Sequence, residues 1–359
     1  LVYLEKRQFG VHAAARVRLH TGEGRVLTMS TRRSISILLG LLAVVVLCAV
    51  CTLATLAAKR LEGAKVEAAP TTTPQYNELG LPYGQELSTE PVEIQPDYLV
   101  FSDRILKRYH HMPADIVDTV DALDQFFAII PAGVNKHLIM APWYIAMEPD
   151  YAMYTDDIPA AIQQVYDGMA EDVHCLDVYA PLFSRRDEYL FARVDEAWTM
   201  RGAYYAAQEF LNTQGIEMIP IDDYEVYYNS SYIGSLEKDT ELVMTEEDQL
   251  YYLLKGATNW QTVTTRVSSG LYETHESPAI ALSRRQNIFL GSNISHSILH
   301  GDGGNGETLL IVGDVFGITF APWFTPYYEN VYFIRAETYN GTLEGFLNLF
   351  EEYNIQNCL

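Results

Sequence analysis

Cysteines are few in this sequence. Of its 359 residues only four are cysteine, and Cys48 and Cys51 lie in one long apolar run, so the pattern is not that of a disulfide-dense scaffold. Cys175 and Cys358 each lie in a shorter apolar run, which favours two buried free thiols. A disulfide between them is the alternative if this part of the chain lies in an oxidising compartment.

Basic residues are scarce too. The chain has 24 Lys and Arg against 47 Asp and Glu, and residues 1–60 hold nine of the basic and two of the acidic ones. The remainder therefore has 15 basic and 45 acidic residues, a formal charge of −30. Such a surface repels polyanions, which argues against nucleic acid as a partner, and a polyphosphate polymer would need bridging cations to bind.

Charge is absent from Ser34 to Ala58, a run of 25 residues. A helix of that length rises about 37 Å, enough to span a hydrocarbon core of about 30 Å. We therefore predict a transmembrane signal-anchor at 34–58. A cleaved secretory signal is the alternative, because ATLAA leaves room for cleavage, although the apolar region of such signals is usually only about 7–15 residues long.

The basic residues flanking this run predict its orientation. Residues 1–33 carry seven of them, so we expect this segment in the cytoplasm and residues 61–359 outside. Met29, followed by STRR and the apolar run, is the natural start in this reading, and residues 1–28 would be upstream sequence that is read through. Residues 61–96 are rich in Pro, Thr and Glu and predict an extended linker.

From Asp97 onward, apolar periodicity predicts a globular α/β domain over 97–359. Helical patterns cover 114–129, 158–169, 200–211 and a last helix around 346–350. Short continuous apolar runs predict strands at 138–141, 173–178, 309–312, 332–334 and 355–359. This alternation predicts a mostly parallel sheet with helices on both faces, and sites in such folds lie at the carboxyl ends of the strands. Residues 222–290 interrupt the alternation and predict a β-rich insert.

Two segments are placed to form a site. VDEAWTMRGAYYAAQEF, 194–210, puts Asp, Glu, Trp and Tyr at the start of a helix that Thr199 can cap, yet it has no His, Cys or Ser. LLIVGDVFGITFAPW, 309–323, reads as a strand, a tight turn and a helix. Such a junction commonly exposes a nucleophile beside backbone N–H groups that can stabilise an oxyanion.

In order and spacing these segments resemble the DHHW family, extracytoplasmic relatives of SGNH hydrolases and of bacterial proteins that O-acetylate alginate. The family signature is close to Y-x-x-T-D-H-H-W-T-x-x-G-A-Y-Y-A, where this chain has ARVDEAWTMRGAYYA at 192–206. The family's later K-D-S-Y-G turn corresponds to GDVFG at 313–317. The resemblance implies a three-layer SGNH-hydrolase-like fold over residues 97–359.

The departures bear on activity. The resemblance implies a triad of an Asp, a His two residues later and the turn Ser. Asp195 is retained, but Ala197 stands at the His position and Val315 at the Ser position. Loss of such a nucleophile or base costs about 10⁶ in turnover. The resemblance also places five residues around the site: Glu196, Trp198, Tyr204, Asp314 and Gly317.

We therefore expect a membrane-anchored extracytoplasmic protein that is catalytically degenerate and binds a cell-envelope glycan or a partner protein. The alternative is an acetyl esterase or O-acetyltransferase acting on an envelope polysaccharide, with Glu196 as a substitute base or Thr319 as a nucleophile. A purely structural role in an envelope complex is a third reading.

The sequence predicts no cofactor and no metal. His296 and His300, with Asp302 after them, have the spacing of a metal pair. Their Gly-rich surroundings, SHSILHGDGGNG, favour a surface loop with isolated histidines instead.

Overall fold

The computed structural model describes residues 87–232, 234–240, 247–254, 262–266, 272–275, 294–301, 303 and 306–359. The predicted cytoplasmic segment, the predicted anchor at 34–58 and most of the predicted linker lie outside these residues. The chain divides into two units, 1–65 and 66–359, and every described residue belongs to the second. Within the described ranges, no helix has both the length and the apolar character needed to cross a membrane.

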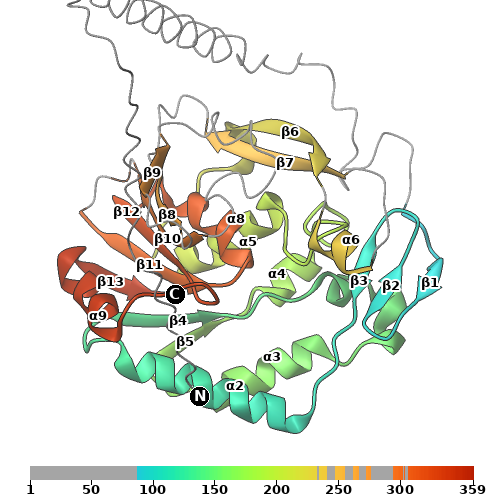
Figure 1. Cartoon of the computed structure of the whole chain (residues 1–359), viewed down its shortest axis with the longest axis horizontal. Helices are drawn as coiled ribbons and strands as arrows, with labels where there is room; N and C mark the ends of the chain where they lie inside the picture. The colour runs from blue at the N-terminus through green and yellow to red at the C-terminus, as the bar shows by residue number, and fades with distance from the viewer. Residues whose placement is uncertain are drawn as a thin grey trace, which may run out of the picture. The chain divides into compact units, whose positions relative to one another are not determined.

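An eight-stranded sheet in the order β5-β4-β13-β11-β12-β10-β8-β9 forms the centre of this unit (Figure 1). Its first five strands pair in parallel. These are β4 (Asn135–Ile139), β5 (Val173–Leu176), β11 (Thr308–Gly313), β12 (Asn330–Arg335) and β13 (Ile355–Cys358). Three antiparallel strands complete it: β8 (Thr262–Arg266), β9 (Tyr272–His275) and β10 (Ile294–His300). The predicted mixed α/β fold with a mostly parallel sheet is confirmed.

Helices cover both faces of the sheet. Successive residues of β11 point to opposite faces: Leu309 and Ile311 belong to one buried apolar cluster and Leu310 to another. The first cluster includes α4 (Tyr179–Phe183), α5 (Met200–Thr213) and α8 (Phe316–Phe320). The second includes α2 (Pro113–Ile129), α3 (Ile158–Gly168) and α9 (Leu343–Glu352). Figure 1 shows α2 and α3 on the side of the sheet opposite to α5 and α8. Burial on both faces explains why these strands read as continuous apolar runs.

Side-chain caps set several helix starts. Asp157 accepts a hydrogen bond from Ala160 N at 3.0 Å, and Thr342 accepts one from Gly345 N at 3.0 Å. Thr199 caps α5 as predicted, since its hydroxyl accepts from Gly202 N at 3.3 Å. Each cap satisfies an amide that the first helical turn would leave without a partner.

A small antiparallel sheet comes before the α/β core. It consists of β1 (Glu93–Ile94), β2 (Tyr98–Val100) and β3 (Ile105–Lys107). Val92 N donates to Val100 O at 2.7 Å, so backbone pairing begins inside the segment that the sequence assigns to the linker. The described residues also contain four 3₁₀ helices: η1 (Tyr144–Met147), η2 (Pro149–Tyr154), η3 (Ile221–Asp223) and η4 (Ala321–Phe324).

The predicted β-rich insert is more varied than expected. It contains an antiparallel pair, β6 (Tyr224–Tyr232) and β7 (Glu247–Leu254), and the short helix α6 (Ser235–Thr240) lies between them in the sequence. Its strands β8 and β9 join the main sheet. The prediction of a surface loop around His296 is wrong, because residues 294–300 form β10. Ser295, Ser297 and Leu299 are fully buried there, and the two serines conceal the apolar pattern.

Candidate functional site

The turn after β11 lies at the carboxyl edge of the sheet. Gly313 O accepts from Ala336 N at 2.9 Å, which ties the end of β11 to the residue that follows β12. Asp314 closes the turn, since its Oδ1 accepts from Phe316 N at 2.9 Å and its backbone O accepts from Gly317 N at 3.1 Å. The two amides that follow Val315 are therefore already engaged.

Gly317 allows α8 to approach the sheet. A methyl group at this position would overlap the ring of Phe333, a fully buried residue of β12. A glycine here brings the start of α8 directly onto the strand beneath it.

The second predicted segment forms a tight loop that meets this turn. Backbone bonds join Ala192 N to Ala197 O at 3.1 Å and Thr199 N to Leu190 O at 2.8 Å, so the loop folds back on itself around Asp195. Trp198 Nε1 then donates to Phe316 O at 3.0 Å. Two segments more than a hundred residues apart in the sequence thus meet at one edge of the sheet.

Ala197 and Val315 lie in the same apolar environment. Ala197 is 8% exposed and belongs to the buried cluster beneath α5 and α8, and the partly buried Val315 packs against that cluster. Neither side chain has a lone pair that could attack a carbonyl carbon or accept a proton.

Asp195 is held by neighbours that the sequence did not single out. Its Oδ1 accepts from Glu196 N at 2.7 Å and from Ser235 Oγ, the first residue of α6, at 2.8 Å. The hydrogen bond from Ser235 Oγ to Asp195, and that from Leu236 N to Val194 O at 3.1 Å, hold the start of α6 against this loop.

Three carboxylates gather near the turn. The pKa of Asp314 is raised, first by burial of the carboxyl among surrounding atoms and then by the negative charges of Glu337 and Glu196. Its side chain still reaches solvent, which screens part of this effect. Glu196 forms an ion pair with Lys107 at 2.9 Å, and Lys107 Nζ lies 4.8 Å from the centre of the Trp143 ring.

The comparisons with known proteins agree with this geometry. Residues 95–334 match the model of the DHHW protein family. The chain belongs to the DHHW family.

Solved structures support the fold of this DHHW chain. A DHHW family protein from Eubacterium siraeum is 17% identical, with a TM-score of 0.63 over 76% of this chain and 92% of that one. Bacillus cereus PatB1, in a structure with a sulfonyl adduct, is 14% identical, with a TM-score of 0.58 over 73% of this chain and 93% of that one. The O-acetyltransferase domain of Pseudomonas putida AlgJ is 12% identical, and its TM-score of 0.42, over 71% of this chain and 86% of that one, is too low to bear on the fold. A search of proteins with curated functions gave no match.

Two expected site-lining residues of the DHHW domain are buried. Trp198 and Tyr204 are each 4% exposed, so neither ring offers a surface to a ligand. Tyr204 donates its hydroxyl to Ile219 O at 3.1 Å and packs edge-on against Trp323. Thr319, the alternative nucleophile, donates weakly to Phe316 O at 3.4 Å within its own helix.

The histidine pair of the DHHW domain does not converge. His296 and His300 lie four residues apart on a strand, which separates them by about 13 Å along β10. His296 stacks on Tyr332, and His300 Nδ1 lies 2.7 Å from Asn330 Oδ1. The two side chains are therefore too far apart to share a metal ion, and Asp302 lies outside the described residues. No group of three or more acidic, His or Cys side chains suited to a metal occurs in the described part of the chain.

Proposed function

We propose that this DHHW domain has lost acyl-transfer chemistry and acts by binding a glycan of the cell envelope or a partner protein. One observation carries the proposal. At the positions where active relatives have a base and a nucleophile, Ala197 and Val315 pack against the same apolar cluster. The engaged amides of Phe316 and Gly317 support it, since both N–H groups that follow Val315 are bonded within the turn and are not available to an oxyanion.

The membrane part of the proposal rests on the sequence. The uncharged run at 34–58 supports an anchor, and the flanking basic residues support an external location for the acidic remainder. A protein held at the membrane by one helix would present its binding surface to the envelope layer next to it.

The alternative, an esterase or acetyltransferase, is favoured by one feature of the site. The raised pKa of Asp314 makes this carboxylate a stronger base than an ordinary aspartate, so it could take a proton from a water molecule as the water attacks an acyl carbon. Glu196 is less suited to that role because it is paired with Lys107.

An assay on the full chain separates the two proposals. We expect release of acetate from a chromogenic acetate ester to stay at the rate of the buffer. The Ala197→His and Val315→Ser double variant should create measurable turnover if the scaffold has kept its geometry, and each single variant should not. Turnover by the unmodified protein that Asp314→Asn abolishes would overturn the non-catalytic proposal.

A sulfonylating reagent provides a second readout, suggested by the sulfonyl adduct in the PatB1 structure. Intact-mass measurement should find no sulfonyl group on the unmodified protein and one group on the double variant, and peptide mapping should place it on the serine introduced by Val315→Ser. A folded double variant that takes up no reagent would show that the geometry of the site has changed along with its residues.

A further inference from the structure

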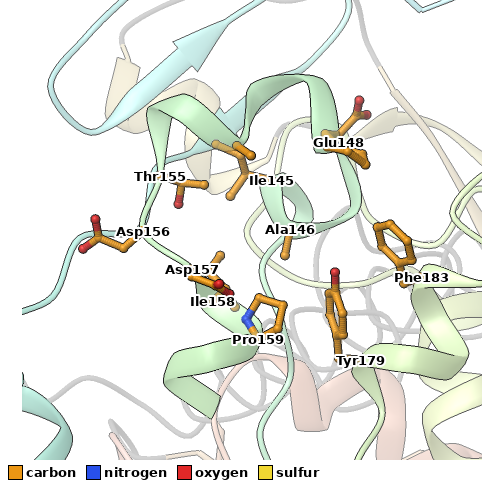
Figure 2. A pocket seen from close by; sticks show the side chains of 12 residues that line it. Ile145, Ala146, Glu148, Thr155, Asp156, Asp157, Ile158, Pro159, Tyr179 and Phe183 are labelled. Atoms are coloured by element: carbon orange, nitrogen blue, oxygen red, sulfur yellow. The ribbon is translucent and has the colours of Figure 1, made fainter. Parts of the chain in front are cut away.

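A pocket of about 370 Å³ is lined by residues from the segments that follow β4 and β5, and none of its lining residues belongs to the turn after β11. Its walls come from η1, η2, the start of α3 and α4 (Figure 2). This volume lies within the range of about 300–1,000 Å³ that is typical of small-molecule sites. Nothing in the motifs of the two site segments involves these residues.

Acidic side chains line part of the pocket. Glu148, Asp156 and Asp157 contribute to its walls, and no Lys, Arg or His does so. Asp156 accepts from His111 N at 2.9 Å and lies 3.3 Å from His111 Nδ1, which lowers the pKa of its carboxyl and keeps it charged. Asp157 uses Oδ1 to cap α3. A carboxylate has acceptor sites beyond one such bond, so Asp157 can still bind a ligand.

Tyr179 supplies the aromatic wall. Its ring stacks beside Phe183 with centres 5.4 Å apart, and in Figure 2 it stands between Pro159 and Phe183 with its hydroxyl directed toward Ala146. The guanidinium of Arg186 already lies 4.6 Å from the Phe183 ring centre, so Tyr179 is the aromatic group left to a ligand. No hydrogen bond within the described part of the chain engages its hydroxyl. Burial raises the pKa of Tyr179, and the negative charge of Asp157, which lines the same pocket, raises it further.

We infer that this pocket binds a sugar ring that carries a protonated amine. The face of Tyr179 that is not stacked on Phe183 suits the apolar face of a sugar and attracts a cation, while Asp157 accepts hydrogen bonds from hydroxyl and ammonium groups. A sugar that carries a carboxylate is disfavoured by the negative charges of Asp156 and Asp157. This inference rests on the proposed function, because it names the class of glycan that the domain would bind.

The pocket adjoins the candidate site through η1. Ile145 and Ala146 line the pocket, and the preceding Tyr144 stacks on Phe191 with ring centres 5.6 Å apart. Phe191 pairs with Trp198 at the base of the Asp195 loop. These contacts connect the wall of the pocket to the loop that carries Asp195 and Glu196.

The test is a ligand-detected NMR titration of the full chain with glucosamine, glucose and glucuronate at physiological ionic strength. We expect affinity to fall in that order, by about fivefold from glucosamine to glucose. Equal affinity for the three, or no saturable binding of glucosamine, would overturn the inference.

Variants locate the binding. Asp157→Asn keeps a good N-cap for α3 while removing the charge, and it should weaken glucosamine binding by about threefold and glucose binding little. Tyr179→Ala should weaken both by about tenfold. Asp118→Asn, which removes the same charge from an exposed site on α2, should change neither. Equal effects of the two aspartate variants would show non-specific attraction to the acidic surface and overturn the assignment to this pocket.

A glycan array separates failure of the pocket from failure of the proposed function. Binding of glycans that is insensitive to Asp157→Asn and Tyr179→Ala would contradict the pocket and leave the glycan-binding proposal standing. Turnover in the esterase assay would contradict the proposed function whatever the pocket binds.

Discussion

The absence of a Cβ atom at residue 317 determines how closely α8 can approach the sheet. Gly313 and Gly317 belong to the same motif and lie at opposite ends of the turn, but their surroundings differ. A methyl group at 317 would overlap the buried Phe333 ring, whereas one at 313 would lie 3.8 Å from that ring, an ordinary contact distance. The family motif alone does not distinguish these two glycines.

Gly317→Ala should therefore lower the free energy of unfolding by about 1–3 kcal/mol, because the Phe333 ring must move within a packed core. Gly313→Ala serves as the matched control and should change it by less than about 0.5 kcal/mol. Urea denaturation of both variants checks this. Equal stabilities of the two would contradict the assigned role of Gly317.

For individual residues, the sequence predicted which positions belong to the motifs but not which other residues they contact. Asp195, Trp198 and the 313–317 turn follow from motif spacing. The bonds from Ser235 to Asp195 and from Lys107 to Glu196 join residues 40 and 89 positions apart, and no periodicity carries such pairings. The burial of Trp198 and Tyr204 also follows from tertiary packing, which a motif does not show.

Among the elements, the small N-terminal sheet is attached to η1 by a buried arginine. Arg104, 1% exposed, donates to Asp103 Oδ1 at 3.0 Å and to Ser88 O at 2.9 Å, and its Nε lies 3.6 Å from Glu148 Oε1. Its guanidinium also lies 4.0 Å from the centre of the Phe101 ring. These contacts join the strand pair β2–β3 to the segment that lines the pocket.

Arg104→Met should destabilise the domain by about 3 kcal/mol, because it leaves Glu148 and Asp103 without their buried cation. The pKa of Glu148 is already raised by burial, so the loss should be smaller at acidic pH, where this carboxyl becomes neutral. Denaturation at two pH values measures both effects. Lys136→Met, which breaks the pair with the exposed Asp172, should barely move the midpoint. If the denaturation midpoint of Arg104→Met is as close to that of the unmodified protein as the midpoint of Lys136→Met is, this account is contradicted.

Helices and strands with a clear pattern of apolar residues were predicted well. The parallel strands are short apolar runs buried on both faces, and α2, α3, α5 and α9 begin or end within a few residues of their predicted limits. β10 was missed because serines and histidines interrupt its apolar pattern. The 3₁₀ helices that line the pocket are too short to show an apolar periodicity in the sequence, so the pocket could not be predicted.

At the scale of the whole molecule, a buried histidine links stability to pH. His137 on β4 is 4% exposed, and burial is the main reason that its pKa is lowered; the charge of His174 adds to this, while a hydrogen bond with Asn357 opposes it. Between the lowered folded pKa and the unfolded value of about 6.5, the unfolded chain binds more protons than the folded one. This histidine therefore lowers stability as the pH falls below about 6.5.

His137→Phe should flatten that part of the pH profile, since a phenylalanine fits beside Phe210 and does not titrate. The unmodified protein should lose up to about 1.4 kcal/mol more per pH unit than the variant within this window. Denaturation midpoints at pH 7.5, 6.5 and 5.5 test the difference. Parallel profiles would show that other groups control the acid response.

The place of β13 in the sheet has a consequence for biosynthesis. This strand, residues 355–358, lies between β4 and β11, so it joins two parts of the sheet that are far apart in the sequence. While the ribosome is still translating the preceding residues, β4 and β11 each expose an unpaired edge with nothing to insert between them. Such edges are open to wrong pairing with other chains until this short strand has been synthesised and inserted between them.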